Sequence, residues 1–157
     1  MALKFRARLA RTISGDPPPV DHWPEAAAQT FKAGDLVFRS GGYVTICGTD
    51  PALIGGIAQE DAHNDVYAGT HTIAVTLINA DTLIRMQIHH VTPGSSVIAV
   101  TDRGTDYGIT VSSNVWYVDK AKTSTYARVR VQEFIDPVGT LDGEVAVQFL
   151  AANREYA

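Results

Sequence analysis

Cysteine is almost missing from the sequence: Cys47 is the one thiol among 157 residues, so an intrachain disulfide is excluded. Cys47 lies in an apolar run, which predicts a small buried side chain, whereas a reactive thiol needs an exposed, electropositive setting. Long apolar runs are missing too, and none approaches the roughly 18–20 residues of a membrane-spanning helix. Arginines interrupt the apolar residues near the N-terminus, so no signal-peptide core forms. We therefore expect a protein that folds in a cytoplasm and has no membrane partner.

Basic residues are outnumbered, with 13 Lys and Arg against 17 Asp and Glu, which gives a net charge of −4. This balance argues against direct nucleic-acid binding, because proteins that bind phosphates present a positive surface. The basic residues are unevenly distributed along the chain. The first fifteen residues contain no acid and four basic residues, Lys4, Arg6, Arg8 and Arg11, so the remaining residues carry a net charge of −8. A basic segment on an acidic body is typical of an interaction segment.

Long segments with a helical period of 3.6 residues are also absent, and the chain instead holds short apolar runs that end at Gly, Asp, Asn or Pro. This pattern predicts an all-β protein, an antiparallel sandwich or barrel of about nine or ten short strands. Ser95–Thr101 is ambiguous between a strand and a short helix, and Gly55-Gly56 indicates a bulge or a close backbone approach. The other predicted strands are Asp35–Arg39, Tyr43–Cys47, Ala52–Ala58, Thr70–Asn79, Leu83–His89, Gly108–Ser112, Val115–Lys120, Tyr126–Phe134 and Glu144–Leu150.

Residues 1–30 are predicted to be an extended N-terminal arm, and residues 31–157 the β body. Lys4–Leu9 alternates basic and mainly apolar residues but has no hairpin partner nearby, so it would add to a sheet edge in this subunit or a neighbour. Pro17–Pro19 predicts a stiff polyproline spacer. A disordered tail is the alternative, although an apolar stripe and an aromatic residue favour docking. The predicted interaction residues of the arm are Lys4, Phe5, Arg6, Arg8, Leu9, Arg11 and Trp23.

The histidines are the obvious candidates for metal ligands. His63 and His71 lie close in sequence to Glu60, Asp61 and Asp65, but structural zinc sites use tighter spacing, and the calcium-loop pattern is absent. Adjacent residues of a strand face opposite sides, so His89 and His90 cannot easily share an ion. We expect ordinary surface histidines and no metal or cofactor.

Motifs for nucleophilic catalysis are missing as well. The sequence has no Gly-x-Ser-x-Gly, and Ser95-Ser96 lacks a neighbouring base in sequence, so we expect no catalytic residue and no enzyme activity. Trp116 and Tyr117 fall on opposite faces of one predicted strand. One face is expected to be core and the other either core, exposed or covered by a neighbouring subunit, since aromatic residues are enriched at interfaces.

Several motifs, taken in order, resemble those of phage capsid decoration proteins, also called cement or auxiliary head proteins. Each motif alone is largely turn chemistry, and the resemblance covers most of residues 31–150. The first group reads Phe-Lys-x-Gly-Asp-Leu-Val from Phe31, Gly-Tyr-Val from Gly42, and Asp-Pro-x-Leu-Ile-x-Gly-Ile-Ala-x-Glu-Asp-Ala from Asp50. The second group reads Asp-x-Gly-x-x-Tyr-Gly-Ile from Asp102, Val-Trp-Tyr-Val-Asp from Val115, and Asp-Pro-Val-Gly from Asp136.

The resemblance implies a structural virion protein made in the host cytoplasm. Such a protein binds the outer surface of an assembled capsid and stabilises it, with the major capsid protein and two further copies of itself, in a homotrimer, as partners. The N-terminal arms would contact neighbours. A β-module of a phage fibre or receptor-binding appendage is the alternative, and a small-ligand barrel or enzyme is the third possibility.

Overall fold

The computed structural model describes residues 6–92 and 94–156, and this part of the chain is nearly all β. The prediction of an all-β fold is therefore confirmed. Three one-turn 3-10 helices occur, and no helix among the described residues is long and apolar enough to cross a bilayer. The strands are β1 (Arg8–Thr12), β2 (Val20–Pro24), β3 (Leu36–Ser40), β4 (Tyr43–Ile46), β5 (Gly56–Ala58), β6 (Thr72–Leu77), β7 (Thr82–His89), β8 (Asp106–Ser112), β9 (Val115–Asp119), β10 (Val129–Phe134) and β11 (Glu144–Phe149). The 3-10 helices are η1 (Val100–Asp102), η2 (Ser124–Tyr126) and η3 (Ala151–Asn153).

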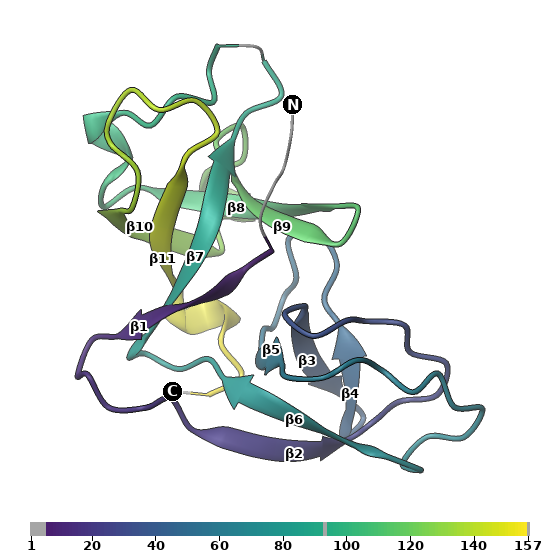
Figure 1. Cartoon of the computed structure of the whole chain (residues 1–157). Helices are drawn as coiled ribbons and strands as arrows, with labels where there is room; N and C mark the ends of the chain where they lie inside the picture. The colour runs from purple at the N-terminus through teal and green to yellow at the C-terminus, as the bar shows by residue number, and fades with distance from the viewer. Residues whose placement is uncertain (1–5, 93, 157) are drawn as a thin grey trace.

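Six strands form a sheet that closes into a barrel (Figure 1). Their order is β1-β7-β11-β10-β8-β9, and β9 returns to pair with β7, so that β7 to β11 make a closed ring of five strands. The closing pair is parallel, with Gln87 opposite Tyr117, whereas the other pairs of the ring are antiparallel. A closed ring removes the sheet edges that otherwise invite aggregation.

The remaining five strands form a second sheet in the order β2-β6-β5-β3-β4. A single parallel bridge between Glu25 and Val44 draws its two edge strands together. In sequence this sheet is inserted between β1 and β7, both of which belong to the barrel. The second sheet therefore extends in sequence from the start of β2 at Val20 to the end of β6 at Leu77, and no boundary between the sheets lies at residue 30.

The glycine pair at the start of β5 allows two strands of the second sheet to approach closely. A Cβ atom at Gly56 would lie 2.3 Å from the backbone oxygen of Thr76 on β6, a distance that no side chain tolerates. Gly55 faces the ring of Trp23 in the same way, at 2.5 Å. The close backbone approach predicted from Gly55-Gly56 is present, and β5 begins at Gly56 and not at Ala52.

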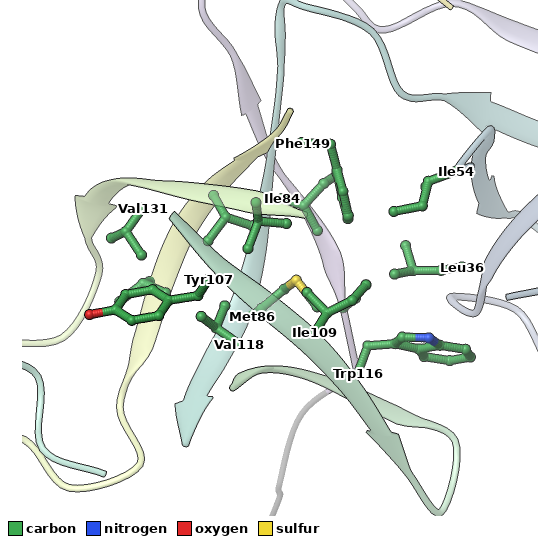
Figure 2. Close-up of a cluster of buried hydrophobic side chains, with 14 of the residues drawn as sticks. Leu36, Ile54, Ile84, Met86, Tyr107, Ile109, Trp116, Val118, Val131 and Phe149 are labelled. Carbon is green, nitrogen blue, oxygen red and sulfur yellow. The ribbon is translucent and has the colours of Figure 1, made fainter. Parts of the chain in front are cut away.

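One hydrophobic cluster joins the barrel to the second sheet. Leu36 of β3 and Ile57 of β5, with Ile54 and Ile78 just outside the strands, are buried in the same cluster as the barrel side chains. Figure 2 shows Leu36 and Ile54 beside barrel residues of this cluster, which include Ile109, Trp116 and Phe149. A smaller cluster fills the interior of the second sheet and consists of Trp23, Phe31, Val37, Val44, Ala58, Ile73 and Val75.

The described part of the predicted arm is extended, but it is built into the two sheets of its own chain. Strand β1 pairs with the first half of β7, where Arg8 lies opposite Arg85, and β2 pairs along β6, where Trp23 lies opposite Ile73. Trp23 is buried in the smaller cluster. Its predicted place on an exposed interaction segment is therefore corrected, because the alternation of β2 turns this side chain inward.

Ser95–Thr101 contains neither of the complete elements considered for it. Val97 forms an isolated bridge with Leu141, and η1 begins only at Val100, with the Asp102 carboxylate accepting a hydrogen bond from the backbone N–H of Ala99 at 2.8 Å. The segment is held to the β10–β11 connection by single hydrogen bonds and not by a strand ladder.

A buried carboxylate fixes β1 to the barrel. Arg8 donates to both oxygens of Glu144, at 3.0 and 3.2 Å, and Arg85 pairs with the same carboxylate, which is buried. We expect Arg8→Met to lower the free energy of unfolding by about 1–3 kcal/mol, because a buried carboxylate then loses a charged hydrogen-bond donor. Urea unfolding followed by circular dichroism measures this change.

Arg130→Met is the matched control, because Arg130 forms an exposed pair with Asp106 at 2.7 Å. Exposed pairs contribute about 0.5 kcal/mol, so this variant should unfold almost as the parent protein does. Equal destabilisation by the two substitutions would contradict the importance of the Arg8–Glu144 contact.

Candidate functional site

Two loops meet at one end of the closed barrel. β7 ends at His89, and β10 and β11 are joined at the same end, because Glu144 at the start of β11 lies opposite Gln87. The loop after β7 and the β10–β11 connection are joined by backbone hydrogen bonds, from Ile98 N–H to Thr140 O and from Gly139 N–H to Ile98 O, both 2.9 Å long. These loops lie at the top of Figure 1.

Aliphatic side chains are exposed on these loops. Four of them, Val91, Val100, Val138 and Leu141, are between 49% and 71% exposed, and we call them the apolar end face. A groove of about 520 Å³ lies at this end and is lined by His89, His90, Val91, Gly94, Ser96, Leu141 and Asp142. Val91 and Leu141 line this groove, while Val100 and Val138 lie on the same two loops. Exposed aliphatic groups on neighbouring loops are typical of a surface that another molecule covers.

A serine, a histidine and an aspartate come together in the groove. The Nδ1 atom of His89 lies 2.8 Å from Asp142 Oδ1 and 3.0 Å from Ser96 Oγ. A catalytic triad needs the serine on the opposite ring nitrogen from the aspartate, and here both approach the same nitrogen. Ser96 also donates its hydroxyl proton to the carbonyl oxygen of His90 at 3.0 Å. The arrangement positions the loop and does not activate a nucleophile.

This cluster was missed by the sequence reasoning, which found no base near Ser95-Ser96. His89 lies seven residues before Ser96 and 53 residues before Asp142, so no short motif contains all three. The register of β7 against β11 brings them together. His90 takes a different partner, accepting a hydrogen bond from the backbone N–H of Thr92 at Nδ1, in keeping with the opposite directions predicted for the two histidines.

His63 and His71 do lie side by side, as their shared loop allowed. Their rings stack with centroids 4.0 Å apart, and each ring nitrogen meets a different carboxylate, Glu25 at 2.8 Å for His63 and Asp65 at 3.0 Å for His71. Two stacked rings with separate partners do not converge on one point. Among the described residues, no group of three or more His, Cys, Asp or Glu is arranged to hold a metal ion.

The arginines predicted to contact a partner are paired within the chain. Arg6 lies 3.0 Å from the buried Asp35, Arg8 pairs with Glu144, and Arg11 pairs with Glu133. Burial raises the pKa of the Asp35 carboxyl, against the opposing effects of the Lys32 backbone N–H and Arg6. These three arginines therefore already pair with carboxylates of the same chain.

The remaining predicted interaction residues fall in different places. Leu9 is partly exposed on β1, whereas Lys4 and Phe5 lie outside the described residues. Trp116 and Tyr117, the aromatic pair for which an interface was one alternative, are both buried within the chain. None of these residues belongs to the apolar end face.

Comparisons with known proteins return no match: no family model, no curated protein and no solved structure corresponds to the chain. The function of the apolar end face therefore has to be inferred from its own chemistry.

Cys47 is the last candidate for a reactive group. Its side chain is buried, its Sγ lies 3.9 Å from the carbonyl oxygen of Leu53, and burial raises the pKa of the thiol well above its usual range, with the charge of Glu155 acting in the same direction. Because only the thiolate is nucleophilic, we expect an aromatic disulfide reagent at pH 8 to leave the folded protein unmodified. The thiol should react fully once urea unfolds the chain. Rapid modification of the folded protein would contradict the burial of Cys47.

Proposed function

We propose that this chain is a structural virion protein that binds the outer surface of a phage capsid as a decoration protein. The observation that carries the proposal is the apolar end face, four exposed aliphatic side chains on two loops that are fixed to a closed barrel. The order of motifs described above points to the same class of protein.

The groove at this end suits protein contact better than catalysis. Its polar groups already bond to one another, since the His89 ring contacts both Ser96 and Asp142. A small-ligand site instead presents convergent polar groups that are free to bind the ligand. Burial of exposed aliphatic groups stabilises a complex by about 25 cal/mol per Å² of apolar surface and needs no specific contact geometry. Such groups are typical of the centre of a protein interface.

The apolar end face is assigned to contact between copies of this chain in a homotrimer. Its four members are uncharged, so copies with a net charge of −4 can meet there without placing like charges in contact. A trimer presents three equivalent capsid-binding surfaces on one particle. Their combined attachment exceeds that of a single chain because the second and third contacts form at high effective concentration. The major capsid protein is the partner that these three surfaces bind.

Leu141→Ser tests the contact between copies. We expect the parent protein to sediment at three times the 16.9 kDa mass of one chain. Leu141→Ser should weaken association at least tenfold, since covering the exposed part of a leucine side chain contributes about 1.4 kcal/mol or more. Val20→Ser is the control, because Val20 is similarly exposed but lies on β2 of the second sheet. Sedimentation equilibrium measures both. A parent protein that remains a monomer at high concentration would remove the trimer from the proposal.

Binding to phage heads tests the decoration function itself. Purified protein is titrated onto bare heads that carry packaged DNA, and the temperature of DNA release is recorded with and without saturation. We expect saturable binding and a higher release temperature, because clamps across capsomer boundaries oppose the outward pressure. A protein that fails to bind heads, and instead binds a surface glycan or turns over a substrate, would contradict the proposal.

A further inference from the structure

Two large apolar side chains stand next to each other at the tip of the connection between β5 and β6. Val66 is 80% exposed and Tyr67 is 78% exposed, more than any member of the apolar end face. We call residues 63–71 the anchor loop. It lies at the lower right of Figure 1, at the opposite end of the molecule from the loops above β7.

The first half of the anchor loop is held by a buried carboxylate. Glu25, just after β2, accepts hydrogen bonds from the backbone N–H groups of His63 at 2.9 Å and Asn64 at 3.3 Å, and also contacts the His63 ring at 2.8 Å. Burial of a carboxylate is costly without such partners. The loop and the carboxylate therefore fix each other.

The second half of the anchor loop is fixed through backbone and side-chain contacts. Gly69 N–H donates to the carbonyl oxygen of Glu25, and Glu25 N–H donates to that of His71, both at 2.8 Å. The Thr70 hydroxyl donates to the Tyr67 carbonyl oxygen at 2.9 Å, which closes the turn at the tip. Gly69 has a φ of +81°, a conformation that few other residues adopt.

A loop without regular secondary structure is thus rigid while its apolar tip is exposed. Loops lose conformational entropy when a partner orders them, and a loop that is already fixed avoids most of this cost. Tyrosine is enriched among the residues that dominate binding energy, since it offers a large apolar ring with few rotatable bonds. The arrangement is that of a preformed anchor for a pocket on another protein.

The distribution of charge indicates which kind of protein carries that pocket. Residues 13–78, which include the whole second sheet, contain eight acids and two bases and carry −6, whereas the rest of the chain carries +2. Glu60 and Asp61 shortly precede the anchor loop in sequence, and Asp65 lies within it. A second copy of this chain would meet like charges here, and an anionic membrane surface or nucleic acid would be repelled.

We propose that Val66 and Tyr67 insert into an apolar pocket with a basic rim on a different protein. Its identity as the capsid shell subunit rests on the proposed function. The chain then uses two separate surfaces, the apolar end face for copies of itself and the anchor loop for the shell. The acidic surroundings of the anchor steer it toward the basic rim, while the tyrosine ring supplies affinity that does not depend on salt.

Tyr67→Ser tests the anchor, with Tyr126→Ser as the matched control because Tyr126 is an exposed tyrosine outside the second sheet. Both variants should keep the urea midpoint and the trimer mass, since both side chains are exposed. Binding to bare heads is measured at 50 and 300 mM salt. We expect Tyr67→Ser to bind at least tenfold more weakly at both concentrations and Tyr126→Ser to bind as the parent does. The parent should lose affinity as salt rises, and Tyr67→Ser should show the same salt dependence.

The outcomes separate the anchor from the decoration function. If the parent binds heads and Tyr67→Ser binds equally well, the anchor is wrong and the decoration function stands. If Tyr67→Ser loses the trimer, the loop contacts a second copy and the proposal of a different partner is overturned. If affinity is independent of salt, the basic rim is wrong. A parent protein that does not bind heads overturns the decoration function and, with it, the shell as the partner of this loop.

Discussion

The fold depends on the burial of a few aliphatic side chains of the second sheet against the barrel. Leu36, Ile54, Ile57 and Ile78 belong to the barrel's own hydrophobic cluster, so neither sheet can separate without exposing part of one core. The residues after η3 reinforce this contact, because Glu155 pairs with Arg39 of β3 and the Tyr156 ring lies 6.1 Å from that of Trp23. Since β1 also starts in the barrel before the chain enters the second sheet, both ends of the described chain fix one sheet to the other.

Strand β7 is central to the closure of the barrel because two strands, β1 and β9, pair with the same edge of it. Its first half pairs with β1 and its second half with β9, while β11 takes the other side along most of its length. β1 must therefore leave the sheet where the parallel pairing with β9 begins. The Arg8–Glu144–Arg85 contact lies near this point. Ion pairs, and not further strand pairing, therefore hold the end of β1 in place. A carboxylate between two guanidinium groups is well satisfied, which explains how Glu144 can be buried.

Local pattern was enough to find the strands but not the partners that they choose. Thr72–Leu77 and Glu144–Phe149 coincide with predicted runs to within two residues, because alternation and turn residues act over short distances. The arm was predicted to lie outside the body because Lys4–Leu9 has no hairpin partner nearby in sequence. Strand β1 nevertheless pairs with β7, and Arg8 contacts Glu144, which lies 136 residues away. The Ser96–His89–Asp142 cluster and the clamp on Glu25 arise from such distant pairings too. No periodicity encodes them, and the exposure of Val66 and Tyr67 was likewise not predicted from the sequence.

In the function proposed here, the separation of charge would give the two apolar surfaces different partners. Aliphatic contacts alone have little selectivity, because any covered apolar area contributes a similar free energy. At the barrel end the aliphatic groups stand on the half of the chain that carries +2, so a neighbouring copy meets little repulsion. At the anchor loop the exposed apolar side chains stand on the part of the chain that carries −6. This charge would disfavour a second copy there and favour the basic partner that we propose. Because the shared core holds both sheets in one body, occupation of the first surface fixes the direction in which the second one points, and a ring of copies would present its anchor loops together to a single underlying shell.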